Sequence, residues 1–255
     1  MIDLSVVIIA LNEESRLGRC LASLPKGVEV VVLDSGSIDG TLQIAANHNA
    51  RTAIRAFDDY ASQKNAALAL ASRAWIFSLD ADEVLSPELS RELVQFVESA
   101  EAKNSKDAFR VRRRLSFMGR IMRFGKTSDR PIRLFPRDGG RFHSKIHEQY
   151  RPDYGSIRPA QFHESAYILH FSYENLTDYF DKFNRYTSRI AEQHKPGDLD
   201  SINFMAHVVR PFFEFGTRYV LRLGFLDGYP GYCYAMLSSL YAFVKYAKVA
   251  ERTLK

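Results

Sequence analysis

The sequence predicts an α/β fold, in which a mostly parallel sheet is covered by helices, followed by a helical C-terminal extension. Residues 4–10 and 28–33 are nearly continuous runs of β-branched and aliphatic residues, as expected for strands buried on both faces. Strand-like and helix-like segments alternate four times before residue 82, which is typical of a doubly wound α/β domain. With 255 residues and 46% hydrophobic content, the chain can bury one such core and still carry an extension.

The elements of the first half follow one another in a regular order. After the first strand we expect a helix, a strand, a helix, a short strand, a helix and a strand, at residues 16–23, 28–33, 41–46, 51–56, 60–71 and 75–79. Ser86 and Pro87 then indicate the cap and first turn of a helix that runs to about residue 100. From there to about residue 170, short apolar runs between Gly and Pro predict mixed sheet and loops.

The C-terminal third of the chain is predicted to be helical. Residues 175–193 form a strongly amphipathic pattern, and from residue 201 the chain is rich in aromatic residues. We expect Pro211 and several glycines to interrupt these last helices. The pattern therefore divides the chain into an α/β domain, with halves at 1–100 and 101–172, and a helical extension at 173–255.

Basic residues are concentrated in the middle of the chain. Residues 109–158 contain 14 Lys and Arg against four Asp and Glu, although the net charge of the whole chain is only +5. Arginine binds phosphate through paired hydrogen bonds, so this region suits an anionic substrate or a diphosphate. No nucleic-acid-binding motif accompanies the charges, and we do not expect nucleic acid as a partner. Two widely separated cysteines predict neither a disulfide framework nor a zinc site.

Two carboxylates, Asp80 and Asp82, directly follow the predicted strand at 75–79. In an open α/β sheet, ligands bind beyond the carboxyl ends of the strands, where the loops converge. Carboxylates at this spacing can bind one Mg²⁺ or Mn²⁺ and a ribose, because diphosphate oxygens and waters complete the coordination of the cation. The triplet alone is also typical of a solvated turn, so its surroundings must decide between the two interpretations.

Two more predicted strands end in polar turns. Asp34 begins the turn at 34–41, whose glycines permit close backbone approach and whose acids can accept a hydrogen bond from a uracil N–H group. The same turn could simply cap the following helix. The end of the first strand adds further candidate contacts to a nucleotide sugar, namely Ala10, Asn12 and Glu13. Three polar strand ends at one edge of a sheet favour a nucleotide-binding site.

The segments SVVIIALNEE, VVVLDSGSIDGT and WIFSLDADE, in this order, resemble the nucleotide-binding half of the inverting family 2 glycosyltransferases. This resemblance covers about the first 100 residues and implies the GT-A fold, a Rossmann-like mixed sheet that binds nucleotide-diphospho-sugars. Looser motifs are similar to the subgroup of lipopolysaccharide-core β-1,4-glucosyltransferases, at residues 63–67, 133–135, 146–148, 226–231 and 245–248. The subgroup implies transfer of a hexose, glucose from UDP-glucose, onto a lipid-linked saccharide such as the lipopolysaccharide inner core.

The resemblance also implies roles for single residues. Asp34 would contact the base and Lys64 would lie near the nucleotide. Asp80 would bind the ribose or the metal ion, and Asp82 the metal ion. Inverting transfer is a single in-line displacement, so it needs one general base for the acceptor hydroxyl. The metal ion, Mg²⁺ or Mn²⁺, would stabilise the departing diphosphate.

The general base is predicted to be Glu148. Family members carry the base well after the metal-binding motif, commonly in a Glu-Asp pair that this sequence lacks. Glu148 lies in the basic region, where it could instead be an ion-pair partner. Asp153 and Glu164 are the alternatives for the base.

Three further residues are candidate contacts. His170 follows an apolar run and could bind the metal ion or the diphosphate, although a lone His in a strand is often only structural. Arg133 and His147 are candidate contacts to the acceptor or to phosphate. Arg133 belongs to the basic stretch that suits phosphate, and His147 flanks the predicted strand at the active site.

The helical extension combines an apolar aromatic face with basic ends. The apolar residues of 233–244 recur at helical spacing before a cluster of lysines and arginines, and residues 210–223 add a second aromatic and basic segment. This pattern is typical of a helix on an anionic membrane surface, but also of one packed on the catalytic domain or a second subunit. No secretion signal or spanning segment is evident. We expect a cytoplasmic protein that is peripheral on the inner face of the bacterial cytoplasmic membrane, and a homo-oligomer is possible.

Other functions are compatible with part of the pattern. A glycosyltransferase for another cell-envelope polysaccharide or glycolipid would share the donor motifs. A nucleotidyltransferase also uses paired acids and a metal ion, but would show a glycine-rich, basic first loop, unlike residues 10–13. A non-enzymatic basic adaptor for membranes or nucleic acid would explain the charge but not the three polar strand ends.

Overall fold

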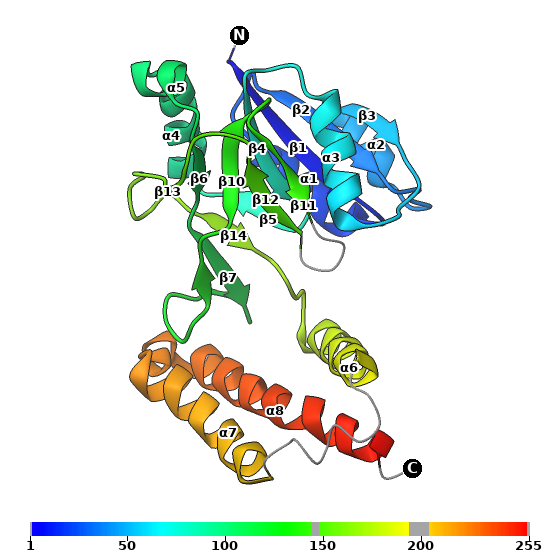
Figure 1. Ribbon diagram of the computed structural model, residues 1–255, viewed down its shortest axis with the longest axis vertical. Coiled ribbons are helices and arrows are strands. Elements are labelled where there is room, and N and C mark those ends of the chain that lie inside the picture. The colour runs from blue at the N-terminus through cyan, green and yellow to red at the C-terminus, as the bar shows by residue number, and fades with distance from the viewer. Residues whose placement is uncertain (1, 144–147, 194–203, 254–255) are drawn as a thin grey trace. The chain divides into compact units, whose positions relative to one another are not determined.

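The computed structural model describes residues 2–143, 148–193 and 204–253 (Figure 1). Contacts divide the chain into two units, of which the first comprises residues 1–113 and 130–170 and the second residues 114–129 and 171–255. The sequence pattern groups residues 114–129 with the α/β domain, whereas their contacts place them in the second unit. The reason is apolar packing, since Leu115, Phe117 and Met122 form a cluster with Tyr179 of that unit.

A seven-stranded sheet forms the centre of the first unit, in the order β13-β6-β10-β4-β1-β2-β3. Its strands are β1 (Leu4–Ala10), β2 (Glu29–Asp34), β3 (Arg51–Ile54), β4 (Trp75–Asp80), β6 (Ala108–Arg110), β10 (Ile132–Pro136) and β13 (Ile157–Pro159). Strand β1 pairs in parallel with β2 and β4, and β2 with β3. Strand β10 is antiparallel to both β4 and β6. The predicted mixed α/β fold is confirmed.

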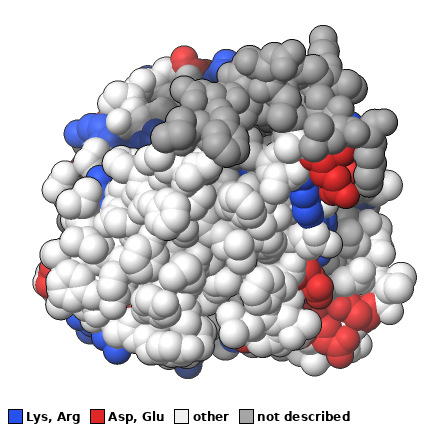
Figure 2. Space-filling model, turned by 90° about the horizontal axis from the view of Figure 1, so that it is seen from below, with Lys and Arg blue, Asp and Glu red and all other residues white. Residues whose placement is uncertain are grey.

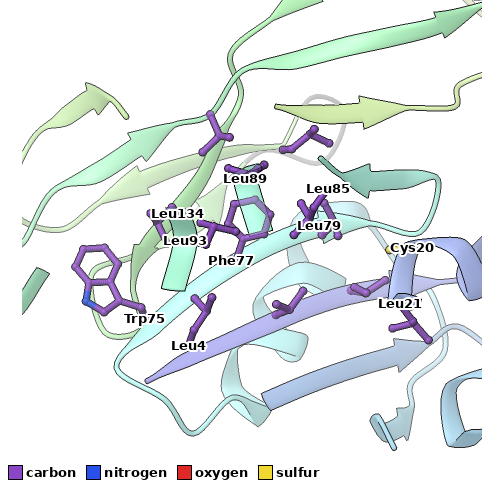
Figure 3. Close-up of a cluster of buried hydrophobic side chains, with 14 of the residues drawn as sticks. Leu4, Cys20, Leu21, Trp75, Phe77, Leu79, Leu85, Leu89, Leu93 and Leu134 are labelled. Carbon is purple, nitrogen blue, oxygen red and sulfur yellow. The ribbon is translucent and has the colours of Figure 1, made fainter. Parts of the chain in front are cut away.

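Helices cover this sheet through two apolar clusters. The helices of the unit are α1 (Glu14–Ala22), α2 (Thr41–Asn47), α3 (Tyr60–Leu70), α4 (Pro87–Glu98) and α5 (Ala100–Asn104). Phe77 and Leu79 of β4 pack with Leu89 in one cluster, part of which Figure 3 shows. Ile76 belongs to the other cluster, which includes Ala67 of α3. This alternation along β4 explains its continuous apolar sequence, because both faces of the strand are covered.

The caps of two helices fix where the chain leaves the sheet. The Ser86 side chain accepts a hydrogen bond from the Leu89 N–H, and Pro87 is the first residue of α4, which confirms the predicted helix start. Asp59 caps α3 in the same way, through the Ser62 N–H. Helix α3 therefore begins just before Lys64, which places this lysine on its first turns.

Two smaller sheet elements complete the first unit. Strand β5 (Glu83–Leu85) pairs antiparallel with β14 (Ile168–His170), so that Glu83 lies opposite His170. Strands β11 (Gly140–His143) and β12 (Gln149–Pro152) form a hairpin on either side of the undescribed residues 144–147. Asn65 of α3 binds the backbone of Phe142 through both its amide nitrogen and oxygen, which anchors β11 to α3.

The second unit is mainly helical. It contains β8 (Arg120–Ile121), β9 (Ser128–Asp129), α6 (Leu176–Gln193), α7 (Phe204–Gly216), a π-helical turn η2 (Thr217–Leu221), a 3₁₀ turn η3 (Gly224–Asp227) and α8 (Gly228–Thr253), with most of β7 (Arg113–Phe117). Helix α8 packs against both α6 and α7. Asp227 is buried and accepts hydrogen bonds from the N–H groups of Arg123 and Phe124, which ties the loop after β8 to the start of α8.

The predicted interruption at Pro211 is wrong, because α7 continues through this residue to Gly216. Helix α7 packs along α8, where the Ser239 hydroxyl donates a hydrogen bond to the Pro211 carbonyl. These tertiary contacts outweigh the loss of one backbone donor at the proline. Among the described residues, no helix has both the length and the apolar character needed to cross a bilayer.

Candidate active site

The carboxyl ends of three parallel strands meet at one edge of the main sheet. In the register of the sheet, Ala10 of β1 lies opposite Asp34 of β2, and Ile9 lies opposite Asp80 of β4. The turns that follow these strands therefore lie side by side, where α/β sheets bind their ligands.

The turn after β2 is organised by Asp34. This buried carboxylate accepts hydrogen bonds from the N–H groups of Gly36 (2.8 Å) and Ser37 (2.7 Å) and from the Ser37 hydroxyl. Gly36 has a φ of +98°, which favours glycine at this position. Asp34 thus shapes the turn in this structure, and its contact with a nucleotide base stays a prediction.

The turn after β1 is joined to the same loop. The Asn12 N–H donates to the Ser37 hydroxyl, and the Ile38 N–H donates to the Asn12 side chain. The Glu13 N–H donates to the Thr41 hydroxyl at 2.8 Å. Because these bonds run in both directions, the two turns form one rigid rim of the sheet edge. The contacts of Ala10, Asn12 and Glu13 with a nucleotide sugar stay a prediction.

Asp80, at the end of β4, is held between two cations. One carboxylate oxygen lies 3.2 Å from the Lys64 ammonium, and the other lies 2.6 Å from the Arg133 guanidinium. Burial alone would raise the pKa of Asp80, but Arg133 and Lys64 outweigh it and hold this pKa well below its usual range. Asp80 is therefore ionised at neutral pH, and both of its oxygens already have a cationic partner.

Glu83 is a member of this cluster that the sequence interpretation missed. It is fully buried and lies 2.6 Å from Arg133 and 2.9 Å from Arg113. It also accepts a hydrogen bond from the Asp80 N–H at 3.0 Å, which fixes the turn between β4 and β5. The only sequence signal for this role was the acid directly after Asp82. Its buried partners lie 30 and 50 residues further along the chain.

Arg133 is buried rather than exposed to an acceptor. Its guanidinium bridges Asp80 and Glu83, and its Nε atom is buried without a hydrogen-bond partner among the described residues. Burial is the largest single effect and lowers the pKa of Arg133, but Asp80 and Glu83 together outweigh it and raise this pKa above its usual range. In this structure Arg133 orders the two acids, while contact with phosphate or acceptor stays a prediction.

Lys64 connects this cluster with Glu148. The same ammonium that binds Asp80 lies 3.0 Å from Glu148 Oε1 and 5.4 Å from the centre of the Phe142 ring. The other carboxylate oxygen of Glu148 has no hydrogen-bond partner among the described residues. Glu148 is thus an ion-pair partner, as the alternative interpretation held, and still has one oxygen available.

A cavity of about 440 Å³ lies beside these residues. Its lining includes Lys64, Asp80, Arg133, Glu148 and Tyr150. Asp153 lines a separate cavity, with Asp138 and Arg141, and is not part of this lining. Glu164 also does not line the cavity beside Lys64. Its backbone carbonyl accepts a hydrogen bond from Arg112. The geometry therefore favours Glu148 over its two alternatives.

The candidate metal ligands divide into two groups. Asp82 Oδ2 lies 3.3 Å from His170 Nε2, so these two side chains converge from the turn after β4 and from β14. A carboxylate and an imidazole fit Mn²⁺, whose other positions diphosphate and water can fill. Asp80 does not fit as a ligand in this arrangement, because Lys64 and Arg133 occupy its oxygens. The described residues contain no group of three or more such side chains placed around one point.

His143 and His147 are the two histidines that lie nearest to Glu148 in the sequence. His147 lies outside the described residues, so its contact with acceptor or phosphate is not tested. His143 ends β11 and is exposed.

The α/β sheet of this order carries acidic turns after β2 and β4, with a cavity beside them. The chain belongs to glycosyl transferase family 2, whose sequence profile matches residues 5–145. It is a glycosyltransferase, and the predicted GT-A fold class is confirmed.

Similar proteins cover nearly the whole chain. The lipopolysaccharide core biosynthesis glycosyltransferase LpsC of Rhizobium meliloti is 33% identical, over 98% of this chain and 93% of its own length. An uncharacterised glycosyltransferase of Rickettsia typhi is 25% identical, over 100% of this chain and 89% of its own length. Among solved structures, S. aureus TarS aligns with 98% of this chain and 54% of its own, with 17% identity and a TM-score of 0.48.

Proposed function

We propose that this glycosyltransferase transfers glucose from UDP-glucose, with inversion, onto a lipid-linked saccharide of the lipopolysaccharide core. The single observation that carries the proposal is the cavity in which Lys64 holds Asp80 and Glu148 together at the end of β4. The name of the Rhizobium meliloti relative supports the lipopolysaccharide core as acceptor. The donor follows from the resemblance to the glucosyltransferase subgroup.

In this mechanism the free oxygen of Glu148 takes the proton of the acceptor hydroxyl. The acceptor oxygen then forms a bond to the anomeric carbon of glucose, while the bond from that carbon to the diphosphate oxygen breaks and UDP leaves. Lys64 positions the base, because it holds the other oxygen of Glu148 at 3.0 Å. The base therefore faces the reacting hydroxyl without having to reorient.

The diphosphate must be stabilised as it departs. Asp82 and His170 would hold Mn²⁺ or Mg²⁺, which supplies positive charge to the departing oxygens. Asp80 would accept a hydrogen bond from the ribose hydroxyls only if Lys64 or Arg133 shares its oxygens. The buried acids and cations around it are fixed in advance, so little reorganisation is needed when charge develops.

Incubation with UDP-glucose, Mn²⁺ and a truncated core oligosaccharide is expected to add one hexose to the acceptor. Mass spectrometry of the product measures this addition, and the anomeric proton coupling in its NMR spectrum should report a β linkage. Other nucleotide sugars and an unrelated envelope glycolipid serve as controls. Transfer to that glycolipid alone would assign the enzyme to another cell-envelope polymer.

We further propose that the second unit rests on an anionic membrane surface. More than half of the exposed large hydrophobic side chains among the described residues lie between residues 208 and 243, including Phe212, Phe213, Leu221, Phe225 and Tyr229. Figure 2 shows a face of the molecule with a broad field that carries no charged side chains. Such a concentration of exposed apolar side chains on an uncharged surface is unusual for a protein surrounded only by water.

Cations lie beside this apolar surface. The exposed Arg120 donates a hydrogen bond to the Leu226 carbonyl, and the Arg222 carbonyl accepts one from the Gly125 N–H. The two acids of the region are paired, since Glu214 lies 2.6 Å from Arg218 and the buried Asp227 lies 3.9 Å from Arg120. An apolar surface with basic side chains at its margin is complementary to an anionic bilayer.

Vesicles of phosphatidylglycerol and phosphatidylcholine are expected to bind the enzyme, and the double variant Phe212→Glu/Leu221→Glu should bind at least about tenfold more weakly. These two side chains are 75% and 72% exposed, so their replacement removes membrane contacts rather than core packing. Ile54→Glu, at a position 68% exposed in the first unit, is the matched control. Cosedimentation measures the effect. Unchanged binding, or a wild-type dimer that the double variant dissociates, would contradict the membrane proposal.

A further inference from the structure

A second cavity, of about 280 Å³, lies entirely within the helical unit. Residues from three helical regions line it, namely the segment before α6 and its first turns, α7 with η2, and α8. The lining combines four tyrosines, Tyr173, Tyr179, Tyr234 and Tyr241, with three basic side chains, Arg210, Arg218 and Lys245. Its size is close to the lower end of the range for small-molecule sites.

Two of its cations gather on one aromatic ring. The Arg210 guanidinium lies 5.5 Å from the centre of the Tyr246 ring and donates a hydrogen bond to its hydroxyl at 2.9 Å. The Lys245 ammonium lies 4.7 Å from the same ring centre. Within the described part of the chain, no carboxylate lies within ion-pair distance of either cation. An anion bound beside this ring would be attracted by both cations.

The one acid of the lining does not compensate these charges. Glu214 lies 2.6 Å from the Arg218 guanidinium, which also donates a hydrogen bond to the Gly125 carbonyl. Glu214 and Arg218 therefore satisfy each other. The positive charge of Arg210 and Lys245 stays available at the cavity.

The four tyrosines of the lining also supply hydroxyl groups. No described residue is a hydrogen-bond partner of the hydroxyls of Tyr173, Tyr179, Tyr234 or Tyr241. Burial raises the pKa values of all four, so each keeps its proton at neutral pH. Aromatic rings with free hydroxyls can both pack against a sugar ring and bond its hydroxyls.

We propose that this cavity binds a saccharide that carries a phosphate or carboxylate group. The anion binds Arg210 and Lys245, and the sugar ring packs against the tyrosines. The assignment of this saccharide to the acceptor rests on the proposed function. The same chemistry is present in a glycerophosphate lipid headgroup, which is the other possible source.

NMR titration with glucose 6-phosphate tests the cavity in enzyme whose donor site is saturated with UDP. The wild type is expected to bind this probe at least about tenfold more tightly than neutral glucose, and the double variant Arg210→Gln/Lys245→Gln should lose at least about tenfold in affinity. Both changed side chains are at the surface of the helices, so the fold should stay intact, which the unchanged spectrum of the first unit would verify. Arg185→Gln/Arg222→Gln removes two exposed basic side chains of the same unit outside the cavity and should bind normally.

Equal affinity of the double variant, or equal binding of glucose and glucose 6-phosphate, would overturn the proposal. Tighter binding of glycerol 3-phosphate than of glucose 6-phosphate would contradict the saccharide and assign the cavity to a lipid headgroup. In the transfer assay, the double variant should raise KM for an anionic acceptor and leave kcat unchanged. Because the titration needs no turnover, absence of transfer would contradict the proposed function without contradicting this site.

Discussion

Replacing Glu148 by glutamine should lower kcat by about 10²–10⁴-fold, the usual contribution of a general base. Glutamine has nearly the same shape and can still accept a hydrogen bond from Lys64, which lies 3.0 Å from Glu148 in the wild type. It cannot take a proton from the acceptor hydroxyl. Donor binding, measured by calorimetry with UDP-glucose, should therefore stay close to that of the wild type while turnover is lost.

Glu98→Gln is the matched control, because Glu98 is exposed at the end of α4. It should leave both kcat and donor affinity unchanged. If Glu148→Gln retained full turnover, the base would have to be Asp153 or Glu164. A loss of donor affinity equal to the loss of turnover would show instead that Glu148 serves to position Lys64 and Asp80.

Replacing Asp82 by asparagine should lower kcat by about 10²–10³-fold and weaken Mn²⁺ binding in the presence of UDP. Asp82 is one of two side chains that converge on the candidate ion site. The variant would keep only His170 as a ligand there. Activity as a function of Mn²⁺ concentration, together with the electron paramagnetic resonance of bound Mn²⁺, measures both effects. The fold should persist, because Asp82 is only half-buried.

Asp138→Asn removes a carboxylate that is 77% exposed and pairs with the neighbouring Arg137, so it should not change the dependence on metal ion. Full activity of Asp82→Asn in excess chelator would refute the metal-binding role of Asp82. The proposed function would then need another source of positive charge for the diphosphate, such as Lys64 or the arginines of the cluster.

The main sheet could be predicted because its strands carry strong local signals. The apolar runs of β1, β2 and β4 are long, bounded by polar turns and alternate with helical patterns, so their order and their parallel direction follow from the sequence. The pairing of Ala10 with Asp34 and of Ile9 with Asp80 then brings their turns together. The proximity of these turns could therefore be predicted from the positions of the strand ends alone.

The buried charge cluster could not be predicted in the same way. Arg113, Arg133 and Glu83 look like ordinary charged residues in sequence, because an ion pair formed across a fold leaves no local pattern. Arg133 lies on β10, which inserts antiparallel beside β4, and this non-sequential neighbour brings its guanidinium to Asp80. Such long-range pairing depends on the order of the strands in the sheet, which the hydrophobic periodicity of the sequence does not reveal.

The helical unit shows the same limit. Its amphipathic helices were evident from spacing, but the sequence patterns did not indicate that residues 114–129 join them or that Tyr173, Tyr179, Tyr234 and Tyr241 surround one cavity. Aromatic residues at helical spacing are as typical of a core as of a binding site. Only the arrangement of α6, α7 and α8 distinguishes the two.

A crystal structure of the enzyme with UDP-glucose and Mn²⁺ tests the central claim most directly. The account predicts that the glucose lies in the cavity beside Lys64, with its anomeric carbon facing the free oxygen of Glu148, and that the ion joins the diphosphate to Asp82 and His170. A glucose bound outside this cavity, with another carboxylate facing its anomeric carbon, would contradict it.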